Sequence, residues 1–233
     1  MANADVVSSD IVGYQQVPVA SGYSLFTATF KDVGDGDIDL CNITPVTAEG
    51  GSITAKGTIY AYKLDSTGAY GTAYRYYTNK SPVGWYSGNT ALTTGTVTFN
   101  AGEGIAVRNA TGATIAFQVS GAVDLVCQNA IPTGYSVTGN STPVSIDLTN
   151  ITPLTAEGGA ITAKGTIYLY QLDSAGSYGT AYRYYTNKTP VGWYVGNTAV
   201  SAGDVTLAAG DAVAVRNATG SSILFQLPSP VTK

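Results

Sequence analysis

The stretch Tyr70-Gly-Thr-Ala-Tyr-Arg-Tyr-Tyr-Thr-Asn-Lys80 occurs twice in this chain, the second time letter for letter as Tyr178–Lys188. It belongs to a longer duplication, because residues 38–119 and 146–227 align without a gap and about 60 of the 82 aligned positions are identical. A duplication of this kind indicates two copies of one small domain. It describes architecture and leaves the chemistry open.

The duplication extends upstream of this block at a larger offset. Ser21-Gly-Tyr-Ser24 resembles Thr133-Gly-Tyr-Ser136 at an offset of 112 residues, against 108 for the gapless block. The first copy therefore carries four extra residues, which we place in Val33-Gly-Asp-Gly-Asp37. The joint Ser120-Gly-Ala122 is too short for a flexible linker, so we expect the copies to touch. The predicted parts are an N-terminal extension (1–9), a first repeat (10–120), a second repeat (121–228) and a C-terminal tail (229–233).

The pattern within each copy is that of strands. Tyr60, Tyr62 and Leu64 alternate with other residues along Thr58–Leu64, and Asp65-Ser-Thr-Gly68 is typical of a turn. The other expected strands of the first copy are Ile11–Val19, an edge strand with Pro18 near its end, Tyr70–Thr78, Thr96–Phe99, Ile105–Arg108 and Ile115–Val119. Short β-branched runs between Gly- and Asn-rich turns predict an all-β fold: two tandem antiparallel β-sandwich domains, jelly-roll or Ig-like, related by internal duplication.

Charge is scarce and evenly spread. Asp, Glu, Lys and Arg make up 11% of the chain, against about 25% in ordinary soluble domains. The net charge is −4 and the cations are single, so nothing resembles the basic stripe that nucleic acid requires. No apolar run is long enough to span a membrane. The opening Met1-Ala-Asn-Ala is not a signal peptide, but a mature form given an initiator Met would look the same, so we expect a secreted or cell-surface protein whose signal has been removed.

Residues suited to catalysis are few. Histidine is absent, which removes the usual general base and the commonest metal ligand. Asp65 is explained by its turn, and Glu49 precedes Gly-Gly in a probable loop. The acidic stretch 32–39 could offer oxygen ligands to calcium but lacks the spacing of an EF-hand loop, so a solvated turn is the preferred interpretation. We therefore expect no catalytic residue, no metal site, no cofactor and no enzymatic activity.

The chain has two cysteines, Cys41 and Cys127. Cys41 aligns with Thr149, so it is not part of the repeated core. Either the two form a disulfide that closes a long loop, or they are two separate buried thiols. Both alternatives stay open.

Aromatic residues are the conspicuous excess, with 17 tyrosines and 2 tryptophans. Alternation places Tyr74 and Tyr76 on one face of a strand, and Arg75 and Tyr77 on the other. Such rings could form the core, bury against another subunit or stack on sugars. The arginines are expected to be salt-bridge or ring-stacking partners on the sheet. The candidates for a ligand or subunit contact are Trp85, Tyr86, Tyr74, Tyr76, Trp193, Tyr194, Tyr182 and Tyr184.

Several short motifs occur in a fixed order: Asp10-Ile-Val-Gly-Tyr14, Gly57-Thr-Ile-Tyr-Ala-Tyr62, Trp85 and Ala101-Gly-Glu-Gly-Ile-Ala-Val-Arg-Asn109. This order resembles that of a largely uncharacterised group of small secreted bacterial β-proteins. The first copy covers the whole pattern. The second copy lacks the opening motif and has Ala209-Gly-Asp-Ala in place of the Gly-Glu-Gly turn. The resemblance implies export and a β-fold.

These observations favour an extracellular structural protein, a subunit of a self-assembling filament, sheath or surface layer. If the first copy packs on the second head-to-tail, the second can pack on the first copy of the next chain, and the assembly stays open. The terminal segments Met1–Ser9 and Pro228–Lys233 could add a strand to a neighbour. The partner is then the protein itself. The alternative is a carbohydrate-binding or adhesive module that contacts polysaccharide through exposed Trp and Tyr.

Overall fold

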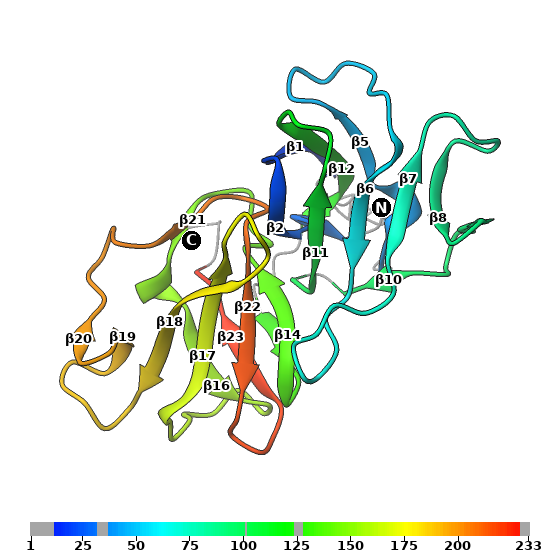
Figure 1. The fold of residues 1–233 in the computed structure, drawn as a ribbon. Helices are drawn as coiled ribbons and strands as arrows, with labels where there is room; N and C mark the ends of the chain where they lie inside the picture. The colour runs from blue at the N-terminus through cyan, green and yellow to red at the C-terminus, as the bar shows by residue number, and fades with distance from the viewer. Residues whose placement is uncertain (1–11, 32–36, 101, 124–127, 229–233) are drawn as a thin grey trace, which may run out of the picture.

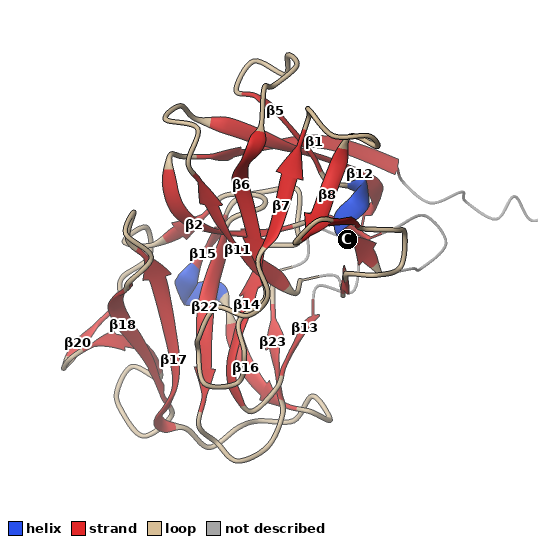
Figure 2. Cartoon of the chain, turned by 45° about the vertical axis from the view of Figure 1, so that its right-hand side comes forward, coloured by secondary structure: helices blue, strands red, loops and turns tan. Residues whose placement is uncertain are grey.

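The computed structural model describes residues 12–31, 37–100, 102–123 and 128–228. Within these ranges the regular structure is almost entirely β-strand. The helices there are two short 3-10 turns, η1 (Leu40–Asn42) and η2 (Leu148–Asn150), drawn blue among the red strands of Figure 2. The all-β class is confirmed.

The strands of the first copy are β1 (Val12–Val19), β2 (Gly22–Thr27), β3 (Phe30–Lys31), β4 (Ile38–Asp39), β5 (Thr44–Thr47), β6 (Lys56–Tyr62), β7 (Tyr74–Tyr77), β8 (Gly84–Ser87), β9 (Thr90–Ala91), β10 (Thr98–Phe99), β11 (Gly104–Asn109) and β12 (Ile115–Val123). Those of the second copy are β13 (Gln128–Ile131), β14 (Gly134–Gly139), β15 (Ile146–Asp147), β16 (Thr152–Thr155), β17 (Lys164–Leu172), β18 (Tyr178–Tyr185), β19 (Gly192–Val195), β20 (Thr198–Ala199), β21 (Thr206–Leu207), β22 (Ala212–Asn217) and β23 (Ile223–Gln226).

The two copies build equivalent sheets. The six-stranded sheet of the first copy has the order β2-β11-β6-β7-β8-β9, and that of the second has the equivalent order β14-β22-β17-β18-β19-β20. Each copy adds a smaller sheet, β1-β12-β3 with β5 or β13-β23-β16, and a two-stranded ribbon. The described sheets do not divide clearly into two tandem sandwiches, so that architecture stays a prediction. Strand β12 continues past the predicted boundary at residue 120.

The offset between equivalent strands locates the four-residue insertion. β2 and β14 are 112 residues apart, whereas β4 and β15 are 108 apart. The extra residues of the first copy therefore lie between Thr27 and Ile38. The sequence comparison placed them at 33–37, which is inside this interval.

A separate hydrophobic cluster forms in each copy. In the first, Ile59 of β6 and Trp85 of β8 share one cluster with Phe117 of β12, so side chains from the six-stranded sheet and the smaller sheet pack together. The equivalent Ile167, Trp193 and Phe225 share the second cluster. Burying one side chain of this size stabilises the fold by about 1.5–3 kcal/mol.

The two copies meet at the edges of their six-stranded sheets, which lie side by side in Figure 1 with β2 and β14 nearest each other. The backbone N–H of Tyr23 in β2 donates to the carbonyl of Ser174 at 3.0 Å, and Tyr135 in β14 donates to Ser66, also at 3.0 Å. Both acceptors lie in the hairpin turn of the other copy. Each edge strand therefore has part of its free backbone satisfied by the opposite copy, which removes an exposed sheet edge.

A second pair of backbone bonds extends this seam. The N–H of Thr27 donates to Gly210 at 3.0 Å, and Gly139 donates to Gly102 at 3.1 Å. Residues 27 and 139 are equivalent, as are 210 and 102. The contact is therefore reciprocal: each copy uses the same surface, as in a two-fold dimer.

The expected contact between the copies is confirmed, but its geometry differs from the head-to-tail packing considered above. A reciprocal contact closes on itself, because the surface that each copy would offer to a further copy is already occupied. The contact within the chain therefore cannot serve as the template for an open chain of subunits.

Candidate functional site

Both tryptophans lie in the core, which corrects the expectation that they are exposed. Trp85 and Trp193 are each 2% exposed. The indole N–H of Trp85 donates to the carbonyl of Ile43, and that of Trp193 to Ile151, both at 2.9 Å. Their polar atoms are satisfied inside the fold, so neither ring is available for stacking on a sugar or on a subunit.

The neighbouring tyrosines are also largely internal. Tyr76 and Tyr184 are buried with their rings edge-on to the tryptophans. Tyr86 and Tyr194 are buried as well, and each hydroxyl donates to a proline carbonyl, Pro82 or Pro190, at 2.6 Å. Tyr74 and Tyr182 are half-buried against the same clusters. Of the alternatives for these rings, the structure has the core role.

The outer face of the first six-stranded sheet instead carries a row of alternating tyrosines and arginines. Tyr23, Arg108, Tyr60 and Arg75 lie directly opposite one another on β2, β11, β6 and β7. The guanidinium carbon of Arg108 lies 5.7 Å from the centre of the Tyr23 ring and 5.3 Å from that of Tyr60. Arg75 lies 5.0 Å from the other side of Tyr60. Each ring is thus attracted to a cation that stays near water.

The second copy repeats this row with Tyr135, Arg216, Tyr168 and Arg183. Arg216 lies 5.9 Å from Tyr135 and 5.1 Å from Tyr168, and Arg183 lies 4.9 Å from Tyr168. We call these two sets the tyrosine–arginine rows. The expected ring-stacking role of the arginines is confirmed.

More tyrosines continue each row toward the seam. Tyr62 stacks on Tyr60 at 6.1 Å between ring centres, and Tyr70 lies 5.3 Å from Tyr62 and 5.4 Å from Tyr23. The Tyr70 hydroxyl donates to the carbonyl of Gly176 at 2.7 Å. Burial, followed by the neighbouring tyrosines, raises the pKa of Tyr70 to about 12.

The reciprocal bond completes the seam. The Tyr178 hydroxyl donates to the carbonyl of Gly68, also at 2.7 Å, and burial raises the pKa of Tyr178 to about 12. Gly68 has a φ of +87–88°, written +88°, and a Cβ placed on it would lie 2.8 Å from the Tyr178 hydroxyl and 2.9 Å from the Tyr135 ring. Glycine is required here both for the backbone and for the close approach of the rings.

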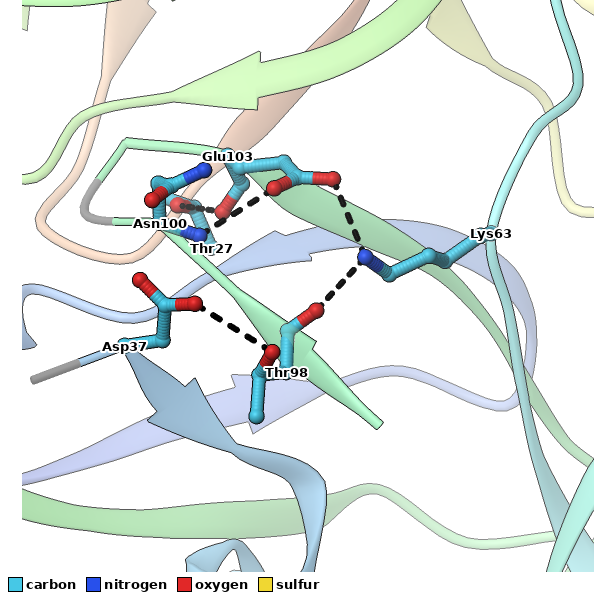
Figure 3. Close-up of polar contacts among 6 residues, drawn as sticks. All are labelled: Thr27, Asp37, Lys63, Thr98, Asn100 and Glu103. Carbon is cyan, nitrogen blue, oxygen red and sulfur yellow. Dashed lines mark hydrogen bonds and ion pairs between the residues drawn. The ribbon is translucent and has the colours of Figure 1, made fainter. Parts of the chain in front are cut away.

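A cleft of about 550 Å³ opens at one end of the seam, between the two copies. Glu103 from the first copy lines it together with Ser136 from the second. Figure 3 shows that the Glu103 carboxylate receives the Lys63 ammonium at 3.2 Å and the backbone N–H of Asn100 at 3.1 Å. Lys63 also donates to the carbonyl of Thr98 at 2.6 Å.

These contacts explain Glu103 as a structural group. Its equivalent Asp211 accepts the same backbone bond, from Ala208 at 2.9 Å, and Lys63 is replaced there by Gln171. Glu103 is the single acidic residue that lines the cleft, and a hydrolase of the two-carboxylate type needs a second. Among the described residues no cluster of three His, Cys, Asp or Glu could hold a metal ion.

The remaining candidates are turns and one thiol. Asp65 accepts the backbone N–H groups of Thr67 at 2.8 Å and Ala69 at 3.0 Å, which confirms its turn role. Burial, together with Asp39, raises the pKa of the Cys41 thiol to about 11. Cys127 lies outside the described residues, as does most of the acidic stretch, 32–36, so the disulfide and calcium alternatives keep their earlier status.

The tyrosine–arginine rows were not among the sequence candidates, although a signal for them exists. Tyr60 and Tyr62 alternate with Ile59 and Ala61, and Arg75 alternates with Tyr76. An arginine is costly to bury without a partner, so its face must be the outer one. Applying that argument to both strands would have placed Tyr60 outside and Tyr76 inside.

No helix in the described part of the chain is long and apolar enough to cross a membrane. Comparison with known protein families, with curated proteins and with solved structures found no match.

Proposed function

We propose that the protein is an extracellular structural protein, a subunit that assembles into a filament, sheath or surface layer by exchanging a terminal strand with its neighbour. It needs no cofactor and has no catalytic role in this proposal. We further propose that each copy is a β-sandwich, jelly-roll or Ig-like. Support comes from the hydrophobic cluster that two sheets of each copy share.

The observation that carries the proposal is the open edge of β1. This strand pairs with β12 over its whole length, Val12–Val19, and no described strand pairs with its other side. Unpaired N–H and C=O groups along a strand of this length are a template for an added strand. Tyr14 projects from the same strand with 61% of its side chain exposed, which offers a partner an aromatic contact.

Strand addition gives an open assembly. The acceptor is β1, and the donor is a different segment of the neighbouring chain, so the contact is heterologous and need not close. The donors that we propose are the extension 1–9 and the tail 229–233, both outside the described residues. Such a contact leaves the reciprocal seam within each chain intact.

The backbone of β1 allows a sharp test. Proline within a sheet occupies a position whose N–H would face away from the neighbouring strand, so Pro18 indicates that even-numbered residues of β1 present their N–H to the open edge. Tyr14→Pro should therefore block strand addition while keeping the pairing with β12. Tyr14→Ala is the matched control, because it removes the ring and keeps the N–H.

Electron microscopy and light scattering across a concentration series provide the readout. Untagged protein should form regular fibres or layers, Tyr14→Ala should still assemble, and both Tyr14→Pro and deletion of Met1–Ser9 should give single particles. Single particles of the unaltered protein at every concentration would contradict the proposal. So would unchanged assembly of Tyr14→Pro.

The alternative function, a carbohydrate-binding or adhesive module, survives in altered form. The buried tryptophans cannot take part, whereas the tyrosine–arginine rows offer outward rings in both copies. Binding of polysaccharide by single particles that never assemble would favour this second candidate.

A further inference from the structure

The four arginines of the chain all lie in the two rows, and their hydrogen-bonding groups are unused. Arg75, Arg108, Arg183 and Arg216 contact tyrosine rings, and among the described residues none of them pairs with a carboxylate or donates a hydrogen bond. A guanidinium carries five N–H donors in a planar fork that matches a carboxylate. Each row therefore presents two held cations whose donors face outward.

Cations are concentrated on this face although the chain is acidic overall, with a net charge of −4. Lys80 lies over the outer ring of Tyr77 at 4.0 Å, and Lys56 is opposite Tyr77 on the neighbouring strand. Acidic residues of the first copy lie elsewhere, for example Asp65 in its turn. A face with this charge favours an anionic partner.

The spacing within a row points to the kind of anion. Arg108 and Arg75 lie on β11 and β7, on either side of β6, so their strands are about 10 Å apart at the usual strand separation of about 5 Å. In an extended polymer of sugar acids, successive rings advance by a distance similar to one strand separation. Alternate carboxylates would then meet the two guanidiniums while the sugar between them lies over the Tyr60 ring.

We propose that the tyrosine–arginine rows bind an acidic polysaccharide, with carboxylates on the arginines and sugar rings on the tyrosines between them. The proposal goes beyond the assembly function and does not rest on it. A nucleic acid is disfavoured, because two arginines in each row of an acidic chain provide little of the phosphate neutralisation on which such binding depends.

Binding of polygalacturonate to the full chain, measured by calorimetry, tests the proposal. Arg75→Gln with Arg183→Gln should weaken binding about tenfold or more, because each row loses one charge-assisted carboxylate contact. Arg75→Lys with Arg183→Lys should also weaken it, since an ammonium keeps the charge and loses the planar fork. Lys56→Gln with Lys164→Gln is the control: it changes the net charge equally, on the same faces, and should have a much smaller effect.

Three outcomes would overturn the proposal: equal loss of binding in the arginine and lysine pairs, equal or tighter binding of neutral dextran, or tighter binding of single-stranded DNA. Thermal melts confirm that each variant is folded. The assembly proposal is tested separately, because Tyr14→Pro should bind polygalacturonate with unchanged affinity per chain whether or not the unaltered protein assembles.

Discussion

The hydroxyls of Tyr70 and Tyr178 couple the seam to pH. Their pKa values are raised from 10.0 to about 12, chiefly by burial, so the phenolate forms more easily in the unfolded chain than in the folded one. The resulting stability is fully present below about pH 10 and is lost as the pH rises toward 12. Ionisation also removes the proton that each hydroxyl donates to a glycine carbonyl.

Tyr70→Phe with Tyr178→Phe should therefore lower the free energy of unfolding at pH 8 by about 0.5–1.5 kcal/mol for each lost hydrogen bond. The variant should also lose less stability than the unaltered protein between pH 10 and 12. Denaturant unfolding at several pH values measures both effects, and Tyr14→Phe, whose ring is exposed, is the control. An unaltered alkaline slope in the double variant would show that other groups cause it.

At single positions, the sequence predicted which residues share a face better than which face is buried. Tyr74 with Tyr76, and Arg75 with Tyr77, do lie on opposite sides of β7. Both sides carry aromatic rings, so hydrophobicity alone could not choose between them. The free energy of desolvating a guanidinium decides the matter, and it places the arginine side outward.

At the scale of elements, strands were predictable because each carries its own alternation. The expected edge strand Ile11–Val19 is β1, and Ile105–Arg108 lies within β11. The hairpin was placed correctly, but in the first copy the continuous strand after the turn begins at Tyr74 rather than Tyr70, which makes an isolated bridge to Leu64. The turn between them follows the other copy, and no local pattern reports that contact.

The hairpin turn offers a test of this docking. Gly68→Ala should destabilise the protein for two reasons, the positive φ of the glycine and the clash of a Cβ with Tyr178 and Tyr135. Gly112→Ala is the matched control, because Gly112 has a φ of +84° and nothing within 4 Å of its Cβ position. We expect the control to cost about 1 kcal/mol and Gly68→Ala clearly more. Equal free energies of unfolding would mean that the tyrosines move aside freely.

At the scale of the whole molecule, the seam was beyond prediction for a physical reason. Its bonds from Tyr23, Thr27, Tyr135 and Gly139 run from backbone N–H to backbone carbonyl, so they leave no side-chain signature in the sequence. The duplication predicted two touching copies but could not tell a reciprocal contact from a head-to-tail one. Only the pairing of equivalent residues in both directions makes that distinction.

A reciprocal seam predicts how a single copy behaves. Because the acceptors Ser66 and Gly102 have equivalents with the same backbone groups in the other copy, a copy meeting its own duplicate can form every backbone bond of the seam. The second repeat (121–228) has its own hydrophobic cluster, so we expect it to fold and to form a two-fold dimer.

Sedimentation equilibrium of this fragment measures its association, and Gly176→Ala is the control variant because a Cβ there meets the Tyr70 hydroxyl at 2.8 Å in the intact chain. In the fragment dimer the partner's equivalent ring, Tyr178, would take the same place. The unaltered fragment should dimerise and the variant should dissociate at lower dilution. A folded fragment that remains monomeric at high concentration would mean that the seam holds only because one chain raises the effective concentration of its two copies.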